Sequence, residues 1–168
     1  MDTQPATRPD SHADHTEKSD TEKSHTDTSP SEVVRWFLTA FQNRDIETTL
    51  LLVDPSAEVN IYSVGVRAGG VDQLRNLLEQ TRDAFPDLLL TVRNLIETGP
   101  VVTAELKVEG TQAADYLGAI NQEKHLDVDE AWRFTVSGDR ITGVDAYWCQ
   151  NQLYRRLAVK RLDHVAIV

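Results

Sequence analysis

The first 29 residues contain no isoleucine, leucine, valine, phenylalanine, tyrosine or tryptophan. Such a segment cannot bury enough apolar surface to offset the entropy lost on ordering, so we predict that residues 1–29 form a disordered tail. The chain of 168 residues also lacks a basic start followed by an apolar segment, and it has no run of about 18 apolar residues. We therefore predict a cytoplasmic protein with no membrane partner, whose single folded domain spans residues 30–168.

Cysteine is nearly absent as well. Cys149 is the only cysteine, which excludes an internal disulfide and a multi-cysteine metal site. The formal net charge is -10, and basic residues cluster only near the C-terminus, whereas phosphate binding requires a basic surface. These features fit a reducing compartment and argue against a nucleic-acid partner, and we expect neither a metal nor a cofactor.

Helix signals open the folded part of the chain. Ser29-Pro30-Ser31-Glu32 reads as a capping box with proline at the first helical position, so we predict a helix from Pro30 to about Asn43. The remaining elements follow from apolar periodicity and from glycine and proline breaks. We predict a second helix at 46–53, a first strand at 57–64, a third helix at 71–84, and four more strands at 88–97, 101–110, 124–136 and 139–150.

Helices followed by a run of strands are typical of an α+β fold. We predict a curved antiparallel sheet wrapped around the N-terminal helices, with a concave face that forms a pocket. The segment 152–168 fits a strand, a short helix or a tail, and its sequence does not choose among them.

One carboxyl group interrupts the apolar face of a predicted strand. Successive strand side chains point to opposite faces, so Glu130 shares its face with Leu126, Val128, Trp132 and Phe134. A carboxyl group in such surroundings must be paired, protonated or used in chemistry. On the following strand the same alternation places Thr142, Val144, Ala146 and Trp148 inward and Asp145 and Tyr147 outward.

Four segments resemble a known family. They are AFPDLLLTV at 84–92, the run VVTAELKVEGT that ends at Thr111, the pair Leu117-Gly118, and WRFTVSGDRITGVDAYW at 132–148. Together they are similar to the SnoaL-type polyketide cyclases of the nuclear transport factor two-like superfamily, over roughly residues 31–157. The resemblance implies a cone-shaped, cystatin-like α+β barrel, a small hydrophobic substrate, and a homodimer formed through the outer sheet face.

The chain also differs from the family at positions where the family has catalytic residues. With Trp132 to Phe134 as the anchor, Glu130 matches a protonated aspartate of ketosteroid isomerase and a histidine of the SnoaL-type cyclases. Ala146 matches the acid/base aspartate of those cyclases, and Phe37 matches the oxyanion-hole tyrosine of the isomerase. The isomerase base matches Ile61 or Tyr62. Ala146 also matches an aspartate of limonene epoxide hydrolase, so the machinery of the aldol cyclase, the isomerase and the epoxide hydrolase is in each case incomplete.

The candidate site therefore centres on Glu130. A buried carboxyl group of raised pKa can act as general acid and base, with Tyr62 as a second catalytic candidate. For Glu130 the alternatives are a structural carboxyl group satisfied by a neighbour and a strand that twists enough to expose it. For Tyr62 the alternative is a first strand on which Val59 and Ile61 face inward. Asp115 lies in the loop expected to close the pocket. The candidate substrate-binding residues are Asn60, Trp36, Phe37, Trp132, Ala146, Trp148 and Tyr116.

These residues favour an enzyme of natural-product biosynthesis, such as antibiotic biosynthesis. We expect a SnoaL-like cyclase or isomerase that acts on a polyketide-type intermediate by general acid/base catalysis in an apolar pocket. Because Ala146 replaces the usual aspartate, ring closure through protonation of an epoxide or enone is as plausible as aldol closure. The alternative is a non-catalytic ligand-binding or dimerisation module of the same fold.

Overall fold

The computed structural model describes Met1 and residues 28–158. The tail prediction therefore falls almost wholly outside the described residues, as do residues 159–168 of the C-terminal segment. The part of that segment that is described begins with a short helix, α4 (Gln150–Arg156).

The helices begin where the sequence predicts. In α1 (Pro30–Gln42), the Ser29 hydroxyl accepts a hydrogen bond from the Glu32 amide, and the Glu32 carboxylate accepts one from the Ser29 amide, at 3.3 and 2.8 Å. This capping box confirms the predicted start. The other long helix is α3 (Val71–Ala84), and between them lies α2 (Ile46–Leu51). In the described part of the chain, no helix is both long and apolar enough to cross a membrane.

Six strands form one open sheet in the order β2-β1-β6-β5-β4-β3. The predicted antiparallel pairing holds from β3 to β6, whereas β1 runs parallel to β6, so the sheet is mixed. The strands are β1 (Val53–Ile61), β2 (Val66–Gly69), β3 (Leu89–Thr98), β4 (Val101–Thr111), β5 (His125–Ser137) and β6 (Arg140–Trp148).

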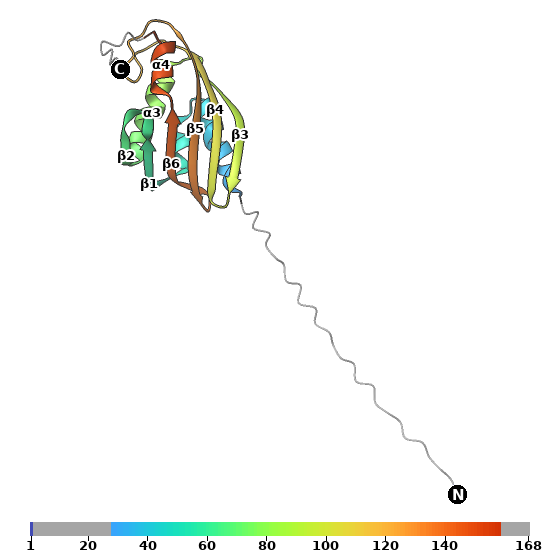
Figure 1. Cartoon of the computed structure of the whole chain (residues 1–168). Helices are drawn as coiled ribbons and strands as arrows, with labels where there is room; N and C mark the ends of the chain where they lie inside the picture. The colour runs from blue at the N-terminus through green and yellow to red at the C-terminus, as the bar shows by residue number, and fades with distance from the viewer. Residues whose placement is uncertain (2–27, 159–168) are drawn as a thin grey trace, which may run out of the picture.

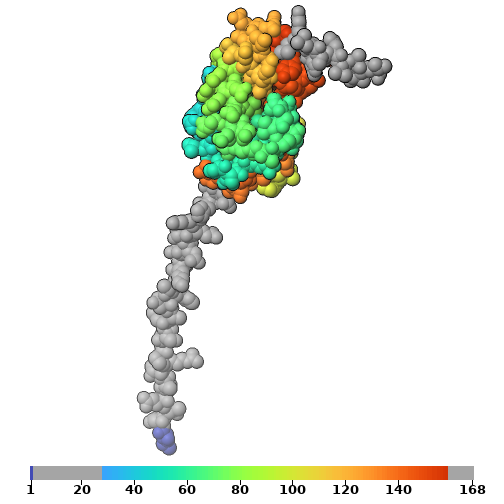
Figure 2. Space-filling model, turned by 90° about the vertical axis from the view of Figure 1, so that its left-hand side faces the viewer, coloured from blue at the N-terminus to red at the C-terminus, as the bar shows by residue number. Residues whose placement is uncertain are grey.

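The helices α1 and α3 pack against one face of this sheet, behind the strands as drawn in Figure 1. The buried side chains of α1 meet the inner side chains of β3 to β6, those of α3 pack against β1, and this layer is the hydrophobic core. Residues 112–124 join β4 to β5 and lie beside α4 at one end of the molecule, in amber and red in Figure 2. The α+β fold class and the single domain are thus confirmed.

Three local differences have physical reasons. The first strand starts at Val53, because β1 continues past Pro55 through a register irregularity where the missing amide breaks no ladder bond. It ends at Ile61, after which Tyr62–Val64 forms a 3-10 turn closed by Gly65 at φ 80°. On β6, an irregularity near Thr142 makes Ile141 the buried residue and leaves Thr142 half-buried.

Candidate functional site

The inner face of β5 contains one carboxyl group among apolar side chains. Leu126, Val128, Trp132 and Phe134 are buried on this face, as the alternation predicts. Glu130 lies in the same row and lines an interior cavity between the sheet and the helices α1 and α3. It also borders a shallow surface groove, so it stands between the cavity and solvent.

The cavity is small in this conformation. The space open to the centre of a water molecule is about 20 Å³, which is enough for roughly one water. Pockets that bind small molecules usually enclose about 300 to 1,000 Å³, so a ligand must push the walls apart. The cavity is lined by Leu38, Phe41, Leu77, Thr81, Leu90, Leu106, Val108, Tyr116, Glu130, Trp132 and Trp148.

Glu130 is held by a single side-chain donor within the described residues. The Trp132 indole nitrogen donates a hydrogen bond of 2.7 Å to Oε2 of Glu130, which leaves Oε1 available to a ligand. Burial raises the pKa of Glu130 to about 7, and the Trp132 hydrogen bond partly opposes this increase. A carboxyl group that is part protonated at neutral pH can both accept and donate a proton.

Two hydroxyl groups form the other polar part of the cavity wall. The Tyr116 and Thr81 hydroxyl oxygens are 3.1 Å apart, and the Thr81 hydroxyl donates to the Leu77 carbonyl at 2.8 Å. Phe85 packs edge-on against the Tyr116 ring at 5.0 Å. Burial and the nearby charge of Glu130 raise the pKa of Tyr116, so this hydroxyl remains protonated.

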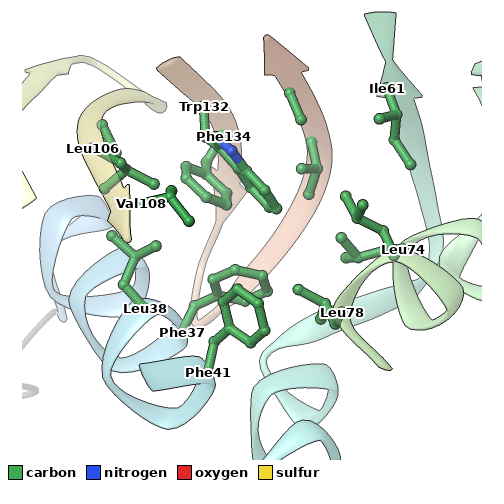
Figure 3. Packing of buried hydrophobic residues seen from close by; sticks show 14 of the residues in the cluster. Phe37, Leu38, Phe41, Ile61, Leu74, Leu78, Leu106, Val108, Trp132 and Phe134 are labelled. Carbon is green, nitrogen blue, oxygen red and sulfur yellow. The ribbon is translucent and has the colours of Figure 1, made fainter. Parts of the chain in front are cut away.

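Several predicted residues meet at the cavity or directly behind it. Trp132, Trp148 and Tyr116 line it. The Phe37 and Trp132 ring centroids are 6.4 Å apart. Figure 3 shows Phe37 pointing from α1 toward Trp132 and Phe134. Ala146 is buried and pairs in register with Trp132, so it belongs to the same inner layer.

The structure does not bring Tyr62 or Asn60 into the cavity. The Tyr62 ring stacks on Tyr147 at 4.5 Å, and the Arg67 guanidinium lies 4.0 Å from its centroid. The Asn60 side chain donates to Asp145 at 2.9 Å and accepts from the Ala68 amide at 2.8 Å. Both side chains leave the inner face because β1 turns Val59 and Ile61 inward, which is the alternative that the sequence left open.

Two other predicted residues also lie away from the cavity. Trp36 is 50% exposed, because α1 buries its opposite side, including Val33 and Phe37. Asp115 is exposed and accepts a hydrogen bond from the Asn121 amide, so it shapes the loop 112–124. Their contact with a ligand in this cavity has no support in the geometry.

Thr81 is the polar wall residue that the sequence did not single out. It is buried on α3 one turn beyond Leu77 and Leu78, so its spacing marks the buried face of the helix. Only the contact with Tyr116 shows that its hydroxyl belongs to a polar pair. Within residues 28–158, no group of three or more histidine, cysteine or acidic side chains is placed to hold a metal ion.

Comparisons with known proteins point to one family. A family model described as SnoaL-like polyketide cyclase matches residues 31–157. No curated protein sequence matches the chain.

Several solved structures are similar to this chain over nearly the whole of their own length. A candidate SnoaL-like polyketide cyclase from Jannaschia sp. CCS1 is 17% identical with a TM-score of 0.71, over 83% of this chain and 99% of that one. IdmH, a candidate polyketide cyclase from Streptomyces antibioticus, is 20% identical with a TM-score of 0.68, over 78% and 99%. AclR, a candidate hydroxylase from Streptomyces galilaeus, is 15% identical with a TM-score of 0.69, over 79% and 97%. At such identities the similarity shows a shared fold.

Proposed function

This chain belongs to the SnoaL-like polyketide cyclase family, and from that premise we propose that it is a cofactor-independent cyclase or isomerase. Its substrate would be a small hydrophobic, polyketide-type intermediate of natural-product biosynthesis. The apolar cavity would hold this molecule in a reactive conformation, and positioning alone can lower a barrier by several kcal/mol.

The observation that supports the proposal is Glu130 in its apolar row. Its Oε2 is fixed by Trp132 at 2.7 Å, and its pKa of about 7 lies where one group can exchange protons in both directions. The buried Ala146 replaces the aspartate that the family resemblance would place there. We therefore assign the proton transfer to Glu130 alone, either at a carbon next to a carbonyl group or at an epoxide oxygen.

The first experiment measures proton exchange on a model ketone. β-Tetralone is a planar, apolar ketone with exchangeable protons next to its carbonyl group, and deuterium uptake from deuterium oxide is followed by proton NMR. Oε1 of Glu130 would take the carbon-bound proton, and the resulting enolate would recover a deuteron. Glu130→Gln keeps the size of the side chain and should lower the catalysed rate by about 10² or more.

A matched variant controls for the loss of one carboxylate. Glu97 is exposed on β3, lines neither the cavity nor the groove, and accepts a hydrogen bond from the Ser31 amide at 3.0 Å, so Glu97→Gln should leave the exchange rate unchanged. Equal rates in wild type and a folded Glu130→Gln protein would refute the acid/base assignment.

The second candidate function is a non-catalytic binding module, which the small closed cavity and the buried Ala146 favour. This alternative predicts that β-naphthol binds, which a change in tryptophan fluorescence would report, and that β-tetralone does not exchange its protons.

We also propose that the chain forms a homodimer, and sedimentation at micromolar concentration tests this. A chain that sediments as a monomer would remove this part of the proposal without affecting the chemistry.

A further inference from the structure

We propose that Tyr116 is a second catalytic group, whose hydroxyl donates a hydrogen bond to an oxygen atom of the bound ligand, and that Thr81 is the residue that positions it. The inference rests on the proposed function, because it gives Glu130 a partner in the same cavity. It adds a requirement on the ligand, which must present a carbonyl or epoxide oxygen next to the atom that exchanges a proton with Glu130.

The direction of the hydrogen bonds follows from counting protons. A hydroxyl group has one proton to donate and two lone pairs to accept. The Thr81 proton is used on the Leu77 carbonyl at 2.8 Å, so in the 3.1 Å contact Tyr116 must be the donor and Thr81 the acceptor. Without a ligand, the Tyr116 proton is therefore used in the hydrogen bond to Thr81.

An entering ligand can reverse this order by rotation of the two hydroxyl groups. Thr81 turns its proton from Leu77 to the Tyr116 oxygen, and Tyr116 turns its own proton toward the ligand oxygen. The Leu77 carbonyl is not left unpaired, because the α-helical pattern also gives it the backbone amide of Thr81. The two hydroxyl groups donate two hydrogen bonds before and after the exchange, and afterwards one of the two goes to the ligand.

The position of the Tyr116 ring is well defined before any ligand arrives. Its backbone exchanges hydrogen bonds with Ala119, at 2.9 and 2.8 Å, and its ring packs edge-on against Phe85. The buried Gln112 amide ties the same loop together through the Ala119 carbonyl at 3.2 Å. A donor that is fixed in advance stabilises developing charge without reorganising.

The chemistry of the pair is complementary. When Oε1 of Glu130 takes a proton from carbon, the electron pair of the broken C–H bond moves toward the neighbouring carbonyl, and negative charge appears on its oxygen. The Tyr116 hydroxyl would donate to this oxygen, and its proton would stay on Tyr116. Because burial keeps the pKa of Tyr116 raised, the hydroxyl stays protonated while Glu130 titrates.

The test uses the β-tetralone exchange assay on the full chain. Tyr116→Phe keeps the ring and removes the hydroxyl, and we expect the catalysed rate to fall roughly 10²-fold, as for loss of one oxyanion donor. Tyr147→Phe is the matched control, because Tyr147 is 40% exposed on the outer sheet face, where it borders the groove but does not line the cavity. It should leave the rate unchanged.

Thr81 is tested by rescue. Thr81→Val removes the hydroxyl with little change in shape, and we expect a fall of about tenfold in the rate at saturating ketone. Thr81→Ser keeps the hydroxyl and should restore most of the rate, although its lost methyl group lowers thermal stability. A merely structural Thr81 would give the opposite order, with the rate following stability.

The outcomes separate this inference from the proposed function. Loss of exchange in Glu130→Gln together with a normal rate in Tyr116→Phe would overturn only the role of Tyr116. A normal rate in Glu130→Gln would overturn the proposed function, and this inference with it. If Tyr116→Phe does not fold, the Thr81 pair decides: a valine variant with a normal rate refutes the inference, and loss with serine rescue supports it.

Discussion

Carboxyl groups on the two faces of β5 and β6 have different hydrogen-bond donors. On the outer face, Asp145 accepts hydrogen bonds from Arg133 at 2.8 Å and from Asn60 at 2.9 Å. On the inner face, Glu130 has the neutral indole of Trp132 as its donor, at 2.7 Å. The two residues lie on neighbouring strands, so the alternation of the strand decides which environment each one meets.

The comparison shows how a candidate site differs from an ordinary polar surface. The other outer carboxylates of β5 are also close to cations, with Asp129 2.9 Å from Arg93 and Asp127 3.5 Å from Lys107. In such pairs the cation stabilises the ionised carboxylate, so the carboxyl group is a poor proton donor at neutral pH. Among the described residues no cation contacts Glu130, whose side chain is half-buried, and its raised pKa reduces the charge it carries at neutral pH.

The largest effect should come from adding a second carboxyl group to the inner face. Ala146 is fully buried beside Trp132, so Ala146→Asp adds both volume and an unpaired acid. We expect a loss of at least about 3 kcal/mol in unfolding free energy at neutral pH. Tyr147→Asp, one residue along on the outer face, should cost about 1 kcal/mol. Equal losses in urea unfolding would contradict the distinction between the faces.

Glu130 should make the stability of the fold depend on pH. Its pKa is about 7 when folded and near the ordinary value of 4.5 when unfolded, so between these values the folded state binds more protons. The contribution of Glu130 to stability should therefore be largest below the unfolded pKa and decline as the pH rises through 7, by up to about 3 kcal/mol.

Comparing Glu130→Gln with wild type isolates this contribution. The variant should match wild type in acid and become the more stable protein at about pH 8, by up to about 3 kcal/mol. Urea unfolding across the pH range measures the difference. Parallel curves for the two proteins would show that the Glu130 carboxyl group is solvated.

The Trp132 indole should have a smaller effect that also depends on pH. Trp132→Phe keeps an aromatic ring on the inner face but removes the donor to Oε2, so the pKa of Glu130 should rise further. We expect a loss of about 1 to 2 kcal/mol at about pH 8 and a smaller loss in acid, where Glu130 is neutral. The exposed Trp36 provides the control, since Trp36→Phe should show no such pH dependence.

Local signals predicted much of the fold. The capping box at Ser29 and Glu32 fixed the start of α1, and alternation identified the inner face of β5. The parallel pairing of β1 with β6 was not predicted, because strand partners far apart in the sequence leave no mark on local periodicity. The short strand β2 was not predicted either, because four residues show little alternation.

The candidate site was predictable only where one strand defines it. Glu130 was identified because a single charge interrupts an apolar row, whereas Tyr62 was misplaced because the sequence of β1 does not decide whether Val59 and Ile61 or Asn60 and Tyr62 face inward. Thr81 and Tyr116 come from a helix and a loop that meet only in the folded chain. Their pairing depends on tertiary packing, which a pattern within one element cannot contain.

The smallest effect should come from an outer ion pair. Arg93 and Asp129 are 2.9 Å apart, with side chains 49% and 61% exposed, so water competes well for both charges. Arg93→Gln should cost about 0.5 kcal/mol or less in urea unfolding at low salt, and the cost should vanish at about 1 M salt because the charges are screened. A loss above about 1 kcal/mol that persists in high salt would mean that this pair is shielded from water in solution. Since the pair lies on the outer sheet face, such shielding would itself be evidence that a second copy of the chain covers that face, and repeating the measurement at several protein concentrations would show it directly.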